Sequence, residues 1–156
     1  MSSPTINIVL LHPQIPQNTG SIGRLCVGLD ANLHIIRPMG FNITERNVRR
    51  AGLDYWQYLK LTLHNDWQSF LAAENPEQLC FASTKATKNY ADCSYKDNCY
   101  IVFGSESHGL PKDFYQEFAD QLYKIPMPGP HSRSINLANS VAVMLYEAHR
   151  QLTQDA

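Results

Sequence analysis

Residues 131–150 read HSRSINLANSVAVMLYEAHR and join a polar cluster to an apolar stretch. Small polar groups and one charge gather in its first part, namely Ser132, Arg133, Ser134 and Asn136. The apolar side chains that follow recur at helical spacing, which predicts a long helix with a wide buried face. They are Leu137, Val141, Met144, Leu145, Ala148 and, just beyond the stretch, Leu152. A polar cluster held at the start of a core helix is a good candidate for a binding site.

Upstream of this helix, short apolar runs alternate with helical patterns. The runs expected to form strands are residues 6–12, 33–38, 58–64, 78–84, 98–104 and 121–127. The helices expected between them are residues 19–30, 44–51, 66–74 and 110–118, and residues 85–98 form the longest expected loop. This alternation predicts an α/β fold with a parallel sheet covered by helices on both faces. A length of 156 residues predicts a single domain spanning residues 1–156.

Three unusual loops follow predicted strands. They are KATKNY at residues 85–90, GSESHG at residues 104–109 and PMPGPHSRS at residues 126–134. Ligands of open parallel sheets bind beyond the carboxyl ends of the strands. The three loops therefore predict one pocket, rich in glycine, proline and backbone amides, that suits a purine-sized ligand.

Several classes of protein are disfavoured by the sequence. No phosphate-binding G-x-x-x-x-G-K-[ST], dinucleotide-binding G-x-G-x-x-G or hydrolase G-x-S-x-G pattern occurs. The four cysteines form no C-x-x-C pair and no histidines stand at zinc-site spacing, so we expect no metal. The start of the chain lacks a signal pattern and no window is apolar enough for a membrane span, which predicts a cytoplasmic protein. With a net charge of -1, any nucleic-acid binding must use a local basic patch or a surface shared between subunits.

Three ordered motifs carry a resemblance to a known family. They are PQNTGSIGRLC at residues 16–26, FGSESHGLP at residues 103–111 and SRSINLANSVAVMLYEA at residues 132–148. Together they closely resemble the SPOUT superfamily of S-adenosyl-L-methionine-dependent RNA methyltransferases, and within it the TrmL (YibK) group. The resemblance implies a C-terminal deep trefoil knot and a homodimer. It also implies 2'-O-methylation of the wobble nucleotide, a cytidine or modified uridine, in the anticodon loop of leucine tRNA.

The resemblance assigns residues to three roles. The expected catalytic set is Arg24, Asn18, Glu106, Ser134 and Asn136, and the expected cofactor-binding set is Ala82, Gly104, Ile125 and Ser134. The expected RNA-binding set is Arg46, Arg49, Arg50, Arg133 and Tyr146. The chain departs from the family pattern at Ser105 and His108, where a proline and an arginine are usual, and the change at 108 affects an expected phosphate contact.

Structural roles remain as alternatives for most of these residues. Asn18, Ser134 and Asn136 are also good helix caps, and Glu106 would favour a helix starting near residue 110 by its charge. Gly104 also suits a plain turn, and Ile125 and Tyr146 suit a core or interface. Arg24 is a poor general base because guanidinium stays protonated, so it would bind phosphate or stabilise an alkoxide.

Two other functions stay open at this point. One is methylation of a different RNA, such as ribosomal RNA. The other is a non-catalytic RNA-binding or assembly protein that keeps the same scaffold. Binding of S-adenosyl-L-methionine separates the second from the enzymes, and mapping of the methylated ribose separates the first.

Overall fold

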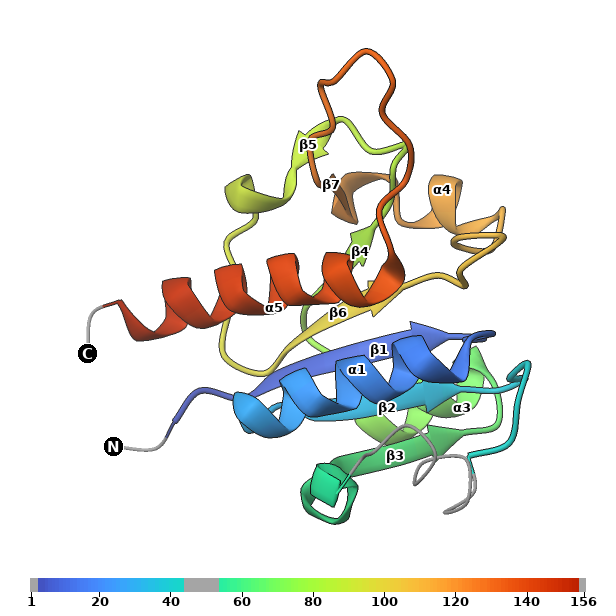
Figure 1. The fold of residues 1–156 in the computed structure, drawn as a ribbon. Helices are drawn as coiled ribbons and strands as arrows, with labels where there is room; N and C mark the ends of the chain where they lie inside the picture. Colours follow the sequence, from blue (N-terminus) through green and yellow to red (C-terminus); the bar gives the residue numbers. More distant parts are fainter. Residues whose placement is uncertain (1–2, 44–53, 155–156) are drawn as a thin grey trace.

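A seven-stranded parallel sheet forms the centre of the protein (Figure 1). The computed structural model describes residues 3–43 and 54–154. Its strands are β1 (Ile6–Leu11), β2 (Asn32–Ile36), β3 (Lys60–His64), β4 (Leu79–Ala82), β5 (Lys88–Asn89), β6 (Cys99–Phe103) and β7 (Leu122–Lys124). They are arranged in the order β3-β2-β1-β6-β4-β7-β5. The predicted α/β class and the parallel sheet are confirmed.

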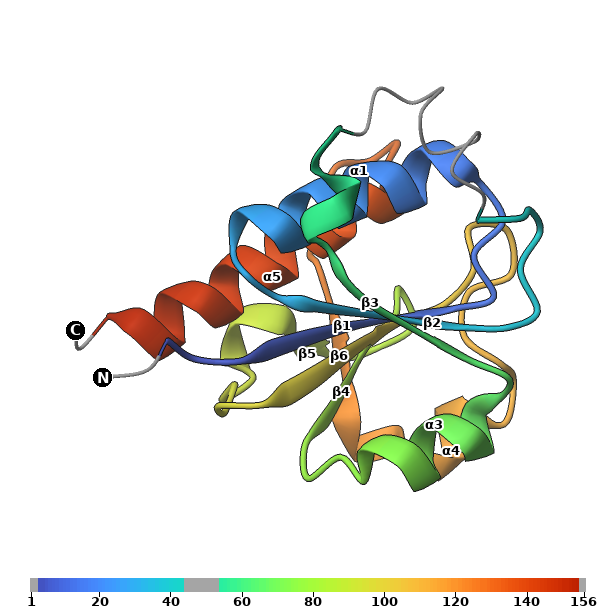
Figure 2. The ribbon, with the colours of Figure 1, turned by 90° about the horizontal axis from the view of Figure 1, so that it is seen from below.

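Helices cover both faces of this sheet, as predicted (Figure 2). The α-helices are α1 (Pro16–Gly28), α3 (Trp67–Glu74), α4 (Phe114–Glu117) and α5 (Leu137–Thr153). Three short 3₁₀ segments complete the description: η1 (Asp54–Tyr58), η2 (Tyr90–Asp92) and η3 (Ala119–Gln121). Helices α1 and α5 lie side by side on one face, and α3 and α4 lie on the other. No helix in the described ranges combines the length and apolarity that crossing a bilayer requires.

The alternation of side chains along the strands produces two apolar cores. On β1, Ile8 and Leu10 face the core under α1 and α5, whereas Val9 and Leu11 face the core under α3 and α4. Successive strand residues point to opposite faces, so a strand covered on both sides is expected to be mostly apolar. This is why the central strands are predominantly apolar in the sequence, with Asn7 on β1 and His34 on β2 as buried polar exceptions.

Strand register places the ends of the central strands at one edge. On one side β1 pairs with β2, and on the other it pairs with β6, with Leu10 opposite Phe103. Strand β4 continues the sheet beside β6, with Ala82 opposite Phe103, and β7 pairs beside β4. The loops that follow β4, β6 and β7 therefore leave the sheet next to one another.

The two principal helices begin differently from each other. Helix α1 starts at Pro16, after Ile15 as its N-cap, so the prediction that Asn18 caps a helix beginning near residue 19 was wrong. Proline fits the first turn of a helix because the amide hydrogen that it lacks has no partner there. In α5, the prediction for Asn136 is confirmed, because its side chain accepts hydrogen bonds from the amides of Ala138 and Asn139.

Other predicted elements are shifted or shortened. The helix expected at residues 110–118 is limited to α4, with Pro111 and Asp113 in the turn before it. The expected loop at residues 85–98 contains β5 and η2, and it buries Cys93 and Tyr95 in the core. The short helix expected at residues 44–51 lies outside the described residues.

Candidate functional site

A pocket with a volume of about 340 Å³ opens at the edge where β4, β6 and β7 end. Two of the three loops that the sequence singles out line it, and the third, residues 85–90, begins directly after Thr84, which also lines it. The residues expected to bind a cofactor all line its wall, namely Ala82, Gly104, Ile125 and Ser134. Asn18, Glu106 and Asn136 line it as well. Seven of the residues chosen from sequence are thus brought together in one cavity.

A chain of side-chain hydrogen bonds connects three distant segments beside this pocket. Asn136 donates through Nδ2 to Oδ1 of Asn18 over 3.0 Å, and Asn18 donates through Nδ2 to Oε2 of Glu106 over 3.2 Å. Asn136 uses its own Oδ1 to accept from the amide of Ala138 at 2.8 Å. Asn18 is only 7% exposed, so its amide is satisfied by these protein contacts rather than by bulk water. These hydrogen bonds therefore join the start of α5, the first turn of α1 and the loop after β6.

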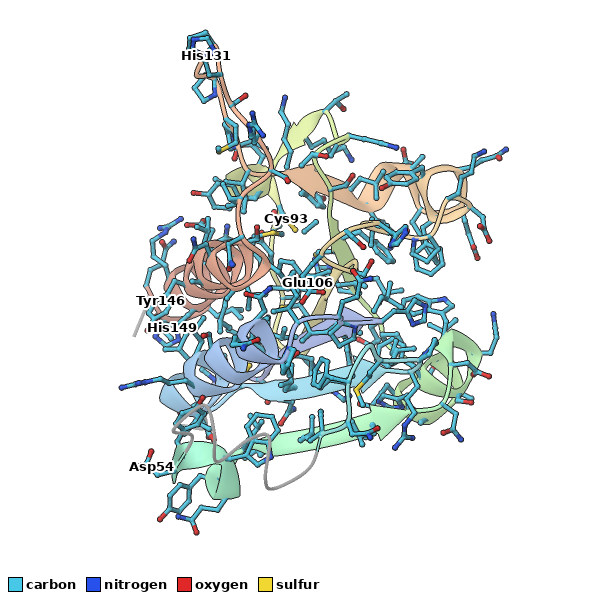
Figure 3. The ribbon with its side chains drawn as sticks, turned by 45° about the vertical axis from the view of Figure 1, so that its right-hand side comes forward. Asp54, Cys93, Glu106, His131, Tyr146 and His149 are labelled. Carbon is cyan, nitrogen blue, oxygen red and sulfur yellow. The ribbon has the colours of Figure 1, made fainter. Side chains whose placement is uncertain are left out.

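The carboxylate of Glu106 lies at the start of α1 (Figure 3). It accepts from the amide of Gln14 through Oε1 and from the amide of Ile15 through Oε2, both over 2.8 Å. The positive end of the helix dipole favours a carboxylate there. The expectation that Glu106 supports a helix starting near residue 110 was wrong, because its hydrogen bonds go to the beginning of α1. Because its oxygens accept from three donors, this carboxylate holds the loop after β6 against the start of α1.

The loop after β6 closes on itself through its backbone. Ser105 donates to the carbonyl of Gly109 over 3.2 Å, and Gly109 donates to the carbonyl of Ser105 over 2.9 Å. A Cβ atom at Gly104 would lie 2.0 Å from the carbonyl carbon of Gly109, which no real side chain tolerates. Gly109 itself has a φ of 69°, a region that glycine adopts without strain. Gly104 is therefore required by the close approach of two backbones.

Gln14 is a contributor that the sequence did not indicate. Its Oε1 accepts from both the amide of Ser107, at 2.9 Å, and the hydroxyl of Ser107, at 2.6 Å. Together with the bonds to Glu106, these contacts join the segment before α1 to the loop after β6. Residues 14 and 107 belong to different segments of the chain, so no local pattern could reveal their pairing.

Aromatic residues of the pocket were also missed. Tyr115 and Tyr123 both line the cavity, and Lys85 lies over the Tyr115 ring with its Nζ 4.8 Å from the centroid. Burial raises the pKa of Tyr123 to about 12, so its phenol stays protonated at neutral pH. Its backbone carbonyl accepts from the amide of Ser83 over 2.9 Å, which ties β7 to the loop after β4.

Arg24 and Tyr146 lie beside the pocket and do not line it. They border a groove of about 690 Å³ between α1 and α5, which shares Asn18 and Asn136 with the pocket. The guanidinium of Arg24 is exposed, and its central carbon lies 6.0 Å from the ring centroid of Tyr55. Tyr146 is 50% exposed and so is not part of the core of this chain (Figure 3). Asn18 and Asn136 thus separate the pocket from a second, open cavity.

The remaining expected RNA-binding residues are placed only in part. Arg133 is exposed on the loop between β7 and α5, directly before Ser134. In Figure 3 this loop carries His131 away from the body of the protein. Arg46, Arg49 and Arg50 lie outside the described residues.

The residues that line the pocket suit a nucleoside with a polar tail. Phe103, Leu110, Ile125 and Leu137 offer apolar contact area, while Ser134 and the exposed backbone groups of the loops offer hydrogen bonds. A volume near 340 Å³ lies within the range of small-molecule sites. Fold and site together define an α/β protein with a pocket of nucleoside-compatible size and lining at the carboxyl ends of parallel strands.

Comparison with known proteins identifies the family. The chain belongs to the SpoU rRNA Methylase family, whose profile matches residues 5–146. A tRNA (cytidine(34)-2'-O)-methyltransferase of Escherichia coli (strain K12) is 49% identical over 148 residues, which cover 94% of each chain.

Solved structures agree with this assignment. One that concerns the 2-OH methylation of C/U34 on tRNA is 40% identical, with a TM-score of 0.89 over 97% of this chain and 98% of the other. The fold also matches the SpoU methyltransferase AviRb from Streptomyces viridochromogenes in complex with AdoMet. That structure is 24% identical with a TM-score of 0.79, and the match covers 97% of this chain and 62% of that chain. The family expected from the three sequence motifs is confirmed.

Proposed function

We propose that this protein is an S-adenosyl-L-methionine-dependent methyltransferase that modifies the 2'-hydroxyl of nucleotide 34, a cytidine or modified uridine, in leucine tRNA. The observation that carries the proposal is the hydrogen-bonded chain of Asn136, Asn18 and Glu106, which brings all three motif segments to one nucleoside-sized pocket. The tRNA substrate and the position of the target nucleotide are supported by the activities named for the E. coli relative and the 40% identical structure.

The pocket is the proposed site of the cofactor. Ala82, Gly104, Ile125 and Ser134 would surround it, with apolar side chains against the adenine and backbone groups on its polar edges. When bound, the cofactor supplies an electrophilic methyl group on a sulfonium. The AdoMet complex of AviRb supports this choice of cofactor for the fold.

The groove between α1 and α5 is the proposed entry of the target ribose. Arg24 lines this groove next to Asn18 and Asn136, at the boundary with the cofactor pocket. Its guanidinium stays charged at neutral pH, so its proposed role is to hold a phosphate or to stabilise the oxygen as the hydroxyl loses its proton. An in-line transfer requires the ribose and the cofactor to be held at fixed positions relative to each other. The proposed role of four residues is to hold the groove and the pocket in place for this, namely Asn18, Glu106, Ser134 and Asn136.

RNA binding is proposed to depend on two copies of the chain. Arg46, Arg49, Arg50, Arg133 and Tyr146 are the proposed contacts to the anticodon loop. A net charge of -1 gives a single chain little attraction for RNA, and a homodimer would double each basic patch. The half-exposed ring of Tyr146 beside the open groove supports its proposed contact with RNA.

Two further features belong to this proposal. The whole chain would form one SPOUT domain, with the segment from β7 to α5 threaded as a deep trefoil knot. The chain leaves β7 near one end of the sheet and returns as α5, which packs against α1 and β1. This return supports such a path. A tRNA substrate and cysteines that are all free support a cytoplasmic location.

The decisive experiment is methylation with a labelled cofactor. The purified protein is incubated with S-adenosyl-L-methionine carrying a labelled methyl group and with total RNA, and the modified nucleotide is then mapped. The proposal expects label on the 2'-oxygen of nucleotide 34 of leucine tRNA. Label on ribosomal RNA alone would assign a different substrate, and a folded protein that gives no heat with the cofactor in calorimetry would be a non-catalytic relative.

A further inference from the structure

Two lysines lie over the two tyrosines that line the pocket. Nζ of Lys85 lies 4.8 Å from the ring centroid of Tyr115, and Nζ of Lys88 lies 5.7 Å from the ring centroid of Tyr123. The tyrosines are part of the pocket wall, whereas the lysines stand outside it. A positive charge over the face of an aromatic ring is held there by electrostatic attraction. Two cations are therefore candidates for a contact with a ligand at the rim of the pocket.

The two ammonium groups differ in their other partners. Lys88 donates through Nζ to the backbone carbonyl of Asp120 over 2.7 Å. Among the residues that the structure describes, no oxygen accepts a hydrogen bond from Nζ of Lys85 and no carboxylate pairs with it. The side chain of Lys85 is exposed, so its three donors can turn toward a ligand.

Backbone contacts hold Lys85 next to the pocket wall. It directly follows Ser83 and Thr84, which both line the pocket. Its amide donates to Oγ of Ser83 over 3.1 Å, and the amide of Ser83 donates to the carbonyl of Tyr123 over 2.9 Å. The start of this loop is thus tied to β7, and the lysine stays close to the rim.

The pocket wall itself offers no positive side chain. The described residues that line it include one carboxylate, Glu106, and no lysine, arginine or histidine. The oxygens of Glu106 already accept from Gln14, Ile15 and Asn18. S-adenosyl-L-methionine carries a carboxylate at the end of its methionine part, and a carboxylate that loses water without gaining an opposite charge is costly. That end of the ligand needs a cation from outside the wall.

We propose that Lys85 binds the carboxylate of the methionine part of the cofactor, with the ring of Tyr115 positioning its ammonium. The inference rests on the proposed use of S-adenosyl-L-methionine by this pocket. Lys85 then determines specificity, because it favours a nucleoside that carries an amino-acid carboxylate over one that lacks it. Lys88, whose Nζ is bonded to Asp120, takes no part.

Two ligands that differ only in the carboxylate test this role. Calorimetry compares S-adenosyl-L-methionine with its decarboxylated form, which keeps the sulfonium and the amine. Lys85→Met should weaken binding of the intact cofactor about five- to ten-fold, between the scales of an exposed ion pair and of a charge-assisted hydrogen bond. It should leave the affinity for the decarboxylated form within about two-fold.

Two further variants are the controls. Lys85→Arg keeps the charge and should retain the preference for the intact cofactor. Lys88→Met removes the matched lysine from the same loop, and the ratio of the two affinities should stay at the native value. Circular dichroism of each variant shows that the fold is retained.

Three results would overturn the role of Lys85. They are an unchanged affinity ratio in Lys85→Met, an equal loss for both ligands, and a ratio that is lost in Arg133→Met but not in Lys85→Met. If the first result comes with weaker tRNA binding, Lys85 contacts RNA phosphate instead. A native protein that binds neither ligand is a different outcome, because it would overturn the proposed cofactor and this inference with it.

Discussion

Asn136 donates a hydrogen bond of 3.0 Å to Asn18, although 118 positions separate the two residues. The same Asn136 caps α5 through its other side-chain atom, Oδ1, and Asn18 continues the chain to Glu106. One asparagine thus fixes the start of a helix and the wall shared by the pocket and the groove. Its two functions can be separated experimentally.

Replacing Asn136 by Asp is expected to impair activity while the cap of α5 is kept. A carboxylate still accepts from the amide of Ala138 and keeps the cap, but it cannot donate to Asn18. We expect a loss of about 1–3 kcal/mol in the free energy of unfolding, because Oδ1 of the nearly buried Asn18 is left without a donor, and a fall in kcat/KM of roughly ten-fold or more. Urea unfolding and steady-state kinetics measure the two quantities. Asn136→Ala should lower both, and equal kinetics in the native and Asp forms would contradict the proposed role.

Replacing Gly104 by Ala is expected to displace the loop after β6. The new Cβ would lie 2.0 Å from the backbone of Gly109, so the loop must move away from the pocket. We expect cofactor affinity to fall by about ten-fold or more, a loss of ~1.4 kcal/mol in binding free energy. Calorimetry with S-adenosyl-L-methionine measures it. Gly129→Ala is the matched control, because a Cβ atom at Gly129 would have nothing within 4 Å of it and no effect is expected.

Removing the guanidinium of Arg24 is expected to slow transfer without weakening cofactor binding. Arg24 lines the groove but not the pocket, so Arg24→Ala should leave the cofactor Kd within about two-fold, well under 1 kcal/mol. Its single-turnover rate should fall by about 10²-fold or more, the usual scale for loss of an electrostatic stabiliser. Calorimetry and rapid-quench kinetics separate the two effects. A large loss of cofactor affinity with a normal transfer rate would place Arg24 in the cofactor site instead.

Acid is expected to destabilise the protein through His34. Burial is the main reason that the pKa of His34 falls from 6.5 to about 4, so between these values the unfolded chain binds a proton that the folded chain does not. Stability is therefore fully present above pH 6.5 and declines as the pH falls toward 4, by on the order of 2 kcal/mol. Urea unfolding at a series of pH values measures the slope.

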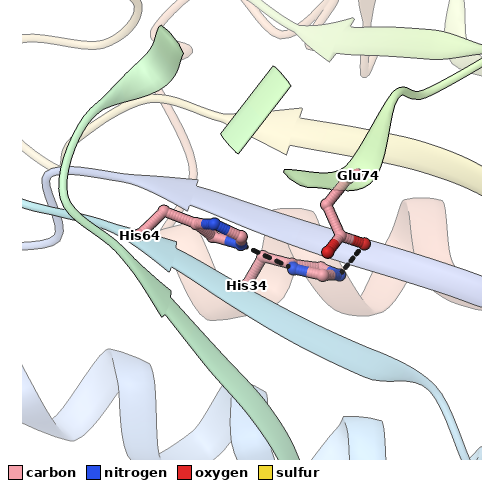
Figure 4. Close-up of side chains that lie close together, drawn as sticks. All are labelled: His34, His64 and Glu74. Atoms are coloured by element: carbon pink, nitrogen blue, oxygen red, sulfur yellow. Dashed lines mark hydrogen bonds and ion pairs between the residues drawn. The ribbon is translucent and has the colours of Figure 1, made fainter. Parts of the chain in front are cut away.

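The control for this pH dependence is a change of His34 itself. His34→Gln should reduce the slope between pH 6.5 and 4. The slope that remains includes His64, which lies beside His34 (Figure 4) and whose pKa burial also lowers. The exposed His131→Ala should keep the native slope. If His34→Gln and the native protein lose stability in parallel, another group controls the acid response.

Local patterns in the sequence were enough to predict the sheet and most of the helices. The apolar runs around Ile8 and Ile101 are buried on both faces of the sheet, and a strand with that burial can hardly be anything but apolar. Asn136 was identifiable as a cap because its position relative to the helix that follows is a local property. The three motifs also indicated several of the residues that line the pocket, among them Asn18, Gly104 and Asn136.

Contacts between distant segments could be decided only by the tertiary structure. The sequence placed Asn18 at a helix start and Glu106 before a different helix, whereas both side chains meet at the first turn of α1. Gln14 with Ser107, and His34 with His64, carry no signal in spacing, because each pair is created by strands that become neighbours only on folding. Hydrophobic periodicity and helix capping involve residues close together in the chain, so they can be predicted from the sequence. Hydrogen bonds across the sheet depend on where the fold brings each side chain.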